Sequence, residues 1–352
     1  MVRWPHVAAF LGLTFGLTWL LDLAIHLRGG LAATPGVVTI LQFQMLLPAF
    51  SAIILGLFVF SESPLYYRHP AGPARWFYYY YLLMTVVTGL GVLAMWLSPE
   101  TNALRLLSTS APVVLSIVGL LVLVILRLRL GREAMERVWL GWGDWPDWVG
   151  FGIAFVAFYA LQAVLNAVTG LGQSQLPQLP APAGMSPQIA LVLGGIQTVL
   201  LGPFIGLLLG FGEEYGWRGY LQNELFQWGR IRGVILVGVI WGAWHWPLIL
   251  MGFNYPGYPL LGLVLMVLYT TGLAVVLGYA VLRSGSILLA AYLHALNDQV
   301  AAFIVAIGFR PHDPAFSFFI GVYGLATLAI VALLVLRDPR WRQPGGNPIH
   351  PT

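Results

Sequence analysis

The chain has 352 residues, of which 59% are hydrophobic and 9% charged, and its mean hydropathy is +0.82. That is too little charge to cover a water-soluble globule, so the composition predicts an integral membrane protein. Cysteine is absent, which excludes thiol catalysis, disulfides and thiolate zinc sites. All 17 basic residues are arginines scattered along the chain, so the basic balance indicates membrane orientation and not nucleic-acid binding.

Long apolar segments predict an all-α fold, a polytopic transmembrane bundle of about ten spans. Lipid offers no hydrogen bonds, so each span is expected to be a helix, and no soluble domain is predicted. In chain order, the predicted spans are residues 7–25, 35–60, 77–97, 113–126, 148–168, 189–212, 234–251, 260–282, 287–307 and 318–336.

A segment rich in Pro and Gln, residues 171–188, is the best candidate for a domain boundary. It separates an accessory bundle of five spans, residues 1–187, from a core that carries the chemically informative residues, 188–310. Residues 311–352 add the last span and a tail. The connections on the side of the termini hold 14 of the 17 arginines, and this bias predicts that both termini lie in the cytoplasm.

Two adjacent glutamates and an arginine follow the uncharged run 189–210. Ionisable groups in or beside a span are costly and often mark a functional site. Glu214 and Arg218 stand four residues apart with the acid first, which favours an ion pair along one helix face. Glu213 is rotated about a third of a turn away and lacks that partner. The alternative interpretation is an interfacial salt bridge that only marks the membrane surface.

Two histidines and an aspartate interrupt later spans. Helix lengths counted from the predicted turns place His245, His294 and Asp298 at about the depth of Glu213. His294 and Asp298 are four residues apart, so both side chains project from one helix face. A single histidine in a span is more often a packed residue, but the four groups together predict a site.

We expect this site to line a cavity that is open to the cytoplasm, with the polar residues Arg218, Gln222 and Glu224 at its mouth. Asp22 and His26 are also four residues apart at the outer end of the first span. For these two, an ordinary interfacial pair is the expected arrangement.

Hydrolysis of an amide fits this set of side chains. It needs an activated water, donors for the developing oxyanion and a proton for the departing amine. A serine nucleophile fits less well because the chain has no GxSxG elbow, and HExxH is also absent. Zinc held by Glu213, His245 and His294 has acceptable ligand types and stays open as an alternative.

The same residues resemble the CPBP family of CAAX-processing and bacteriocin-processing (Abi-type) membrane proteins, which includes the type 2 CAAX prenyl proteases. The family pattern is EExxxR, then FxxxH, then HxxxN or HxxxD on successive helices. The corresponding stretches here are residues 213–218, 241–245 and 294–298, in the same order. The resemblance covers roughly residues 189–307, and the first five spans carry no motif.

The resemblance implies a glutamate-dependent intramembrane endopeptidase that needs no metal or other cofactor. It implies that Glu213 and His245 activate a water. It also implies that His294 and residue 298 stabilise the oxyanion, while the ion pair of Glu214 holds the motif helix.

Two positions depart from the family pattern. Trp241 replaces the usual phenylalanine, and Asp298 stands where the prenyl proteases have asparagine. An ionised carboxylate cannot donate a hydrogen bond to an oxyanion. Either Asp298 is protonated or orients His294, or Asn297 supplies the amide. The aspartate at position 298 therefore weakens the expectation of a prenylated substrate more than the expectation that the protein hydrolyses peptide bonds.

Three functions follow from these observations. The leading hypothesis is a peptidase that acts on a membrane-embedded peptide or a lipidated protein, with the lipid bilayer as its surroundings. The second is a non-catalytic membrane scaffold or immunity protein of the same fold. The third is a proton-coupled transporter that uses the same side chains as relays, although no repeated pair of interrupted spans supports it.

Overall fold

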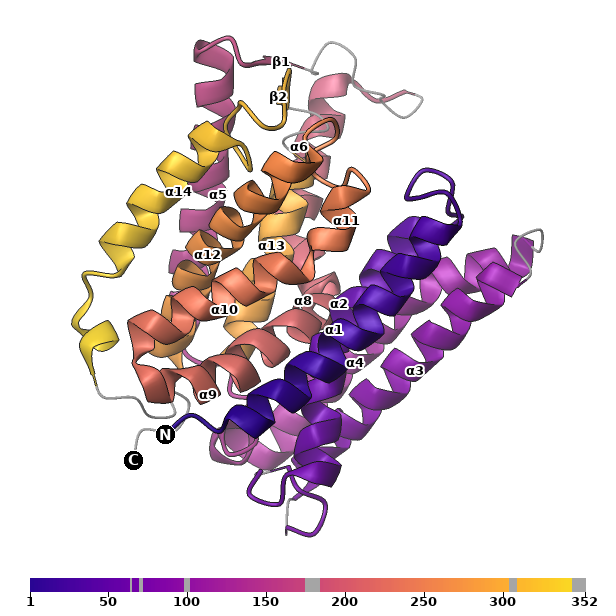
Figure 1. Cartoon of the computed structure of the whole chain (residues 1–352), viewed down its shortest axis with the longest axis vertical. Helices are drawn as coiled ribbons and strands as arrows, with labels where there is room; N and C mark the ends of the chain where they lie inside the picture. The colour runs from indigo at the N-terminus through magenta and orange to yellow at the C-terminus, as the bar shows by residue number, and fades with distance from the viewer. Residues whose placement is uncertain (64, 70–71, 98–101, 175–183, 304–308, 344–352) are drawn as a thin grey trace.

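The computed structural model describes residues 1–63, 65–69, 72–97, 102–174, 184–303 and 309–343, and these form helices almost throughout (Figure 1). The first half contains α1 (Trp4–Leu27), α2 (Val37–Ile54), α3 (Trp76–Leu97), α4 (Asn102–Glu136), α5 (Trp145–Val168) and the short strand β1 (Gly172–Ser174). The second half contains α6 (Pro187–Ile196), α7 (Gly202–Ile205), α8 (Leu207–Glu214), α9 (Gln222–Leu225), α10 (Arg230–Trp244), α11 (Trp246–Leu250), α12 (Pro259–Ser284), α13 (Ile287–Phe303), β2 (Phe309–Pro311) and α14 (Val322–Val335).

Seven helices in the described part of the chain are long and apolar enough to cross a membrane, and α13 and α14 are shorter apolar helices. The predicted all-α polytopic bundle is therefore confirmed. The segment predicted as one span over 189–212 is broken instead: α6 passes through a π-helical turn into α7 and then α8. Pro203 lies at the start of α7, where a missing backbone N–H costs least. Residues 304–307 of the ninth predicted span lie outside the described residues.

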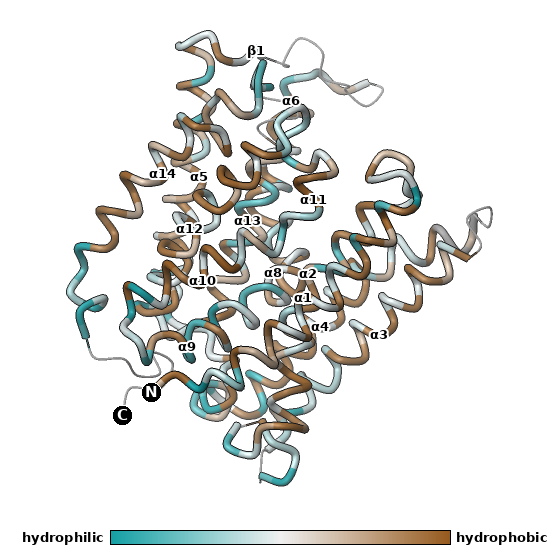
Figure 2. The backbone as a smooth tube through the Cα atoms, in the orientation of Figure 1, coloured by the Kyte–Doolittle hydropathy of each residue, from teal (hydrophilic) through white to brown (hydrophobic). Residues whose placement is uncertain are grey.

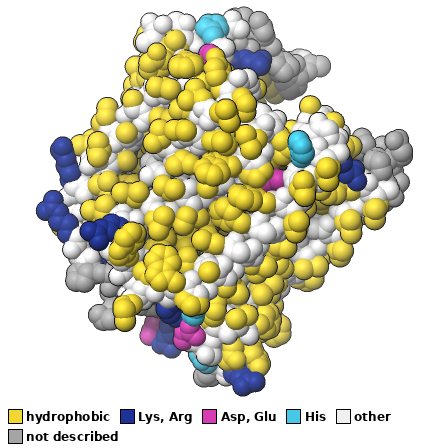
Figure 3. Space-filling model, in the orientation of Figure 1, with side chains coloured by type: hydrophobic (Ala, Val, Ile, Leu, Met, Phe, Trp, Pro, Cys, Tyr) yellow, Lys and Arg dark blue, Asp and Glu magenta, His cyan; other side chains and the backbone are white. Residues whose placement is uncertain are grey.

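The outer surface of the bundle is apolar. Large side chains on the outside of the helices are exposed, among them Leu83 at 61% and Leu333 at 63%. Figure 2 shows hydrophobic residues along most of the helices, and Figure 3 shows apolar side chains over most of one side of the molecule. Lipid is the solvent that such a surface requires, so the protein is an integral membrane protein.

The motif helix α8 lies between α2 and α13, with contacts to both. Two glycines make this close packing possible. A Cβ at Gly210 would meet the backbone carbonyl of Ala291 on α13, and one at Gly212 would meet the backbone of Met45 on α2. Small residues at helix contacts allow backbones to approach within a membrane. They place the end of α8, and hence Glu213, at the centre of the bundle.

The N-terminus and the last described residues, 339–343, lie at the same end of the bundle, which is called the terminal end below (Figure 1). Arg3 pairs with Glu224 on α9, and Arg230 at the start of α10 donates to the backbone carbonyl of Arg340. The connection between α1 and α2 is at the opposite end. There, β1 and β2 form an antiparallel pair that joins the segment after α5 to the segment before α14.

Candidate active site

A cavity of about 850 Å³ lies between α2, α10, α12 and α13. Its walls include the predicted site residues Glu213, His245, His294, Asn297 and Asp298. They come from three parts of the chain: the end of α8, the residue after α10 and the middle of α13. The structure thus brings the predicted side chains to one cavity.

Glu213 is held by two indole groups. Its Oε2 accepts hydrogen bonds from Trp241 Nε1 at 2.7 Å and from Trp217 Nε1 at 3.3 Å. Only 3% of the residue is exposed. An indole can only donate, so Oε2 is engaged as an acceptor and the carboxylate is fixed in orientation. Oε1 remains, 3.7 Å from His294 Nε2.

Behind Glu213, Glu214 and Arg218 form the predicted ion pair at 2.9 Å, and both side chains are fully buried. Glu214 Oε1 also accepts from His294 Nδ1 at 2.6 Å. The Arg218 guanidinium lies 4.3 Å from the centre of the Trp241 ring, a cation–π contact. A buried pair of this kind contributes little net stability, but removal of either partner leaves an uncompensated charge. The hydrogen bond from His294 to Glu214 therefore fixes α8 relative to α13, and Arg218 holds Glu214 in place for it.

His245 lies at the turn between α10 and α11. Its Nδ1 is 2.9 Å from the backbone carbonyl of Trp241. A carbonyl can only accept, so Nδ1 carries a hydrogen and Nε2 of the neutral ring keeps its lone pair. The preceding residue is held by α1, because Trp244 Nε1 donates to Thr18 Oγ1 at 3.0 Å and the Trp244 carbonyl accepts from Trp19 Nε1 at 3.1 Å.

His294 lies among three carboxylates. Nδ1 donates to Glu214, because an ionised carboxylate can only accept. Nε2 is 3.6 Å from Asp298 Oδ2 and 3.7 Å from Glu213 Oε1. Both distances exceed a direct hydrogen bond and are compatible with a bridging water.

Comparison with known proteins finds a similarity for the part of the chain that contains the site. Residues 195–300 match the family model described as type II CAAX prenyl endopeptidase Rce1-like. This region is therefore similar to that family, and it is called the Rce1-like region below. All three motifs lie inside it, so the resemblance to the CPBP family is confirmed.

The Rce1-like region is also similar to the CAAX prenyl protease 2 of Methanococcus maripaludis, with 40% identity over 53 residues. That match covers 15% of this chain and 20% of the relative, so it spans only about a fifth of the curated protein. No solved structure matches the chain.

The cavity does not open where the sequence suggested. Its outer wall includes Val38 at the start of α2, Asn254 in the connection from α11 to α12, and His312 after β2. All three lie at the end of the bundle opposite the termini. Figure 3 shows a notch in the upper right of the surface, with acidic side-chain atoms visible there. The sequence predicted both cytoplasmic termini and a cavity that opens to the cytoplasm. Because the cavity mouth and the termini lie at opposite ends of the bundle, these two predictions cannot both hold.

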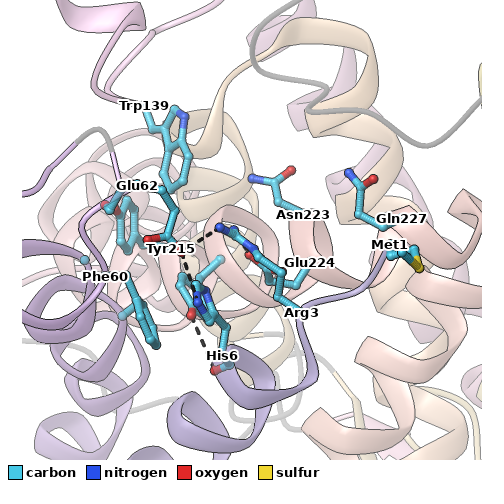
Figure 4. Close-up of a pocket in the computed structure, with 14 residues that line it drawn as sticks. Met1, Arg3, His6, Phe60, Glu62, Trp139, Tyr215, Asn223, Glu224 and Gln227 are labelled. Atoms are coloured by element: carbon cyan, nitrogen blue, oxygen red, sulfur yellow. Dashed lines mark hydrogen bonds and ion pairs between the residues drawn. The ribbon is translucent and has the colours of Figure 1, made fainter.

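The predicted polar mouth is wrong as well. Arg218 and Gln222 are fully buried beneath the Rce1-like region's surface. Glu224 lines a separate pocket of about 430 Å³ near the N-terminus, where Arg3 pairs with Glu224 and with Glu62 (Figure 4). Arg218, Gln222 and Glu224 follow α8 in the chain. The helical run after Glu213 leads away from the cavity toward the terminal end of the bundle, where the N-terminus lies, so these three residues do not line the cavity mouth.

The predicted pair of Asp22 and His26 is also wrong. Asp22 is 1% exposed and accepts from Gln44 Nε2 on α2 at 2.6 Å, whereas His26 lies on the outside of α1. Gln44 lines the cavity. The spacing of four residues fits a helical pair, but α2 covers the Asp22 face of α1, and the sequence carries no signal for that packing.

The arrangement of the possible ligand atoms bears on the zinc alternative. Among the described residues, no group of three or more His, Asp or Glu side chains is arranged to hold a metal ion. In addition, Oε2 of Glu213 already accepts from two indoles. Only Oε1 of Glu213 is then left for a metal ion.

Proposed function

We propose that the protein is an intramembrane endopeptidase that uses Glu213 to hydrolyse a peptide bond in a membrane-embedded or lipidated substrate. The observation that carries the proposal is the shared cavity: a fixed carboxylate and two imidazoles with different hydrogen-bonding states line it. The Rce1-like match over the same residues supports it.

The chemistry follows from the atoms that remain available. A water between Glu213 and His245 Nε2 gives its proton to this pair as its oxygen attacks the scissile carbonyl. When the carbon–nitrogen bond breaks, the same proton passes to the departing amine. Two indole donors keep the Glu213 carboxylate from turning away, so little reorganisation is needed during the reaction.

His294 is suited to the oxyanion. Its Nδ1 is committed to Glu214, and Glu214 is itself held by Arg218. The ring orientation is therefore fixed, and Nε2 faces the cavity near Glu213. With a hydrogen on Nε2, this nitrogen donates to the oxygen of the tetrahedral intermediate. Preorganised donors of this kind typically contribute about 3–4 kcal/mol to transition-state stabilisation.

The residues that line the cavity indicate the class of substrate. Much of the cavity is apolar, with Leu41, Met45, Leu248 and Leu273 among the lining residues, and it lies in a protein surrounded by lipid. These walls suit an apolar peptide segment or a lipidated one. The relative named CAAX prenyl protease 2 makes a prenylated peptide the first substrate to test.

We also propose an orientation. Arg218 is buried and does not report on sidedness, but the remaining arginines still favour cytoplasmic termini. The cavity mouth then faces the opposite side of the membrane.

The test uses the full chain in proteoliposomes with two synthetic peptides of one sequence, one farnesylated and one not. Mass spectrometry detects new peptide ends. Glu213→Gln and His245→Ala are expected to lower the rate by about 10²–10⁴-fold, while Glu62→Gln, in the separate pocket, leaves it unchanged. Wild-type rates in Glu213→Gln would remove the proposal and favour a scaffold. Loss of wild-type activity with a chelator would favour zinc.

A further inference from the structure

Two tyrosines from outside the three motifs converge on Asn297. Tyr159 on α5 donates its hydroxyl to Asn297 Oδ1, and Tyr269 on α12 does so at 3.0 Å. The two hydroxyls are also 3.0 Å apart. All three residues are buried, with exposed fractions of 3%, 9% and 4%. The carboxamide is thus clamped between helices from both halves of the chain.

This clamp determines which way the amide points. Asn297 Nδ2 lies 3.1 Å from Asp298 Oδ1. An ionised carboxylate only accepts, so the amide nitrogen must face Asp298 and the amide oxygen must face the phenols. A carbonyl oxygen has two lone pairs, and two phenols occupy them. The orientation is therefore fixed from both sides.

Asp298 receives its orientation from this amide. Oδ1 accepts from Asn297, and Oδ2 is directed toward His294 Nε2 at 3.6 Å. The Asp298 side chain is otherwise 48% exposed, because it borders the cavity. Without the amide, few contacts would keep the carboxylate beside the histidine.

We infer that Tyr159 and Tyr269 are positioning residues for the site: they act through Asn297 to hold Asp298 against His294. Asn297 then serves as the hydrogen-bonded link between the two phenols and Asp298, and the Asp298 carboxylate, 3.6 Å from His294 Nε2, orients the histidine instead of donating to an oxyanion. The catalytic role of these hydrogen bonds rests on the proposed function. Through Tyr159, helix α5 also contributes to the site, although it belongs to the half of the protein that carries no motif.

Ring nitrogen NMR tests the inference without any substrate. The protein is labelled with ¹⁵N-histidine in detergent micelles, and the His294 signals are assigned by their loss in His294→Gln. Tyr159→Phe with Tyr269→Phe removes both hydroxyls but keeps both rings. The double variant is expected to shift the His294 signals and leave those of His245 unchanged. Tyr292→Phe is the matched control, because Tyr292 lies on α13 with Asn297 but packs on Trp148 and Phe204.

Activity supplies a second readout. In the proteoliposome assay, the double variant is expected to lower kcat about tenfold, and Tyr159→Phe alone is expected to lower kcat with little change in KM, because Tyr269 lines the cavity and Tyr159 is not among its lining residues. If the double variant does not fold, each single variant is measured and is expected to show part of the same shift.

Unchanged His294 signals in the double variant, or an equal shift in Tyr292→Phe, would overturn the inference. A selective His294 shift in a protein whose wild-type form hydrolyses neither peptide would leave the hydrogen-bonded chain intact and remove the proposed function. The two failures are therefore distinguishable.

Discussion

Replacement of Trp241 by the phenylalanine that the family pattern has at this position is expected to impair this protein. Phenylalanine keeps an aromatic ring but removes the indole N–H, which makes the shorter of the two hydrogen bonds to Glu213, at 2.7 Å. Hydrogen bonds to charged groups contribute about 1.5–3 kcal/mol, which corresponds to a rate loss of roughly 10- to 150-fold if the orientation of Glu213 limits the reaction. The Trp217 indole, at 3.3 Å, is too distant to compensate fully.

The assay compares kcat in proteoliposomes for Trp241→Phe, Trp217→Phe and Trp148→Phe. Trp148 donates to the Trp142 carbonyl outside the site and serves as the matched control. We expect the greatest loss in Trp241→Phe, a smaller loss in Trp217→Phe and none in the control. Full activity in Trp241→Phe, or a greater cost in Trp217→Phe, would show that these indoles do not orient the carboxylate.

Three further predictions concern the stability, the helix packing and the membrane topology of the protein. Arg218→Met should destabilise the protein by about 3–5 kcal/mol, because it leaves Glu214 buried without its cation; denaturant unfolding in micelles measures this, and a loss below about 1 kcal/mol would contradict it. Gly210→Ala should separate α8 from α13, because the added methyl meets the Ala291 carbonyl; unchanged melting temperature and activity would contradict it. A cysteine at Asn254 should react with an impermeant maleimide from the side opposite an N-terminal cysteine, in a chain with no native cysteine; reaction from the same side would contradict the topology.

The sequence was most informative where chemistry is local. Glu214 and Arg218 pair as their spacing requires, since both lie on one helix face. Glu213, His245 and His294 were recognisable because charged and imidazole groups inside apolar helices are costly and rarely accidental. Helix type and the membrane environment followed from hydropathy alone.

The sequence was least informative where partners come from other helices. Asp22 bonds to Gln44 instead of His26 because α2 packs on α1, and no local pattern specifies which helices are neighbours. The phenol of Tyr159 reaches Asn297 from α5 for the same reason. The mouth of the cavity was misplaced because helix length alone fixes depth without fixing the end from which water enters.

The central claim is that Glu213 directs a water onto a peptide carbonyl, and one turnover in H₂¹⁸O tests it most directly. With enzyme in excess over the cleaved peptide, we expect wild-type protein to place ¹⁸O in the new carboxyl end of the peptide and Glu213→Gln to release no product. Label found instead on the Glu213 carboxylate, or equal product from Glu213→Gln, would contradict the account.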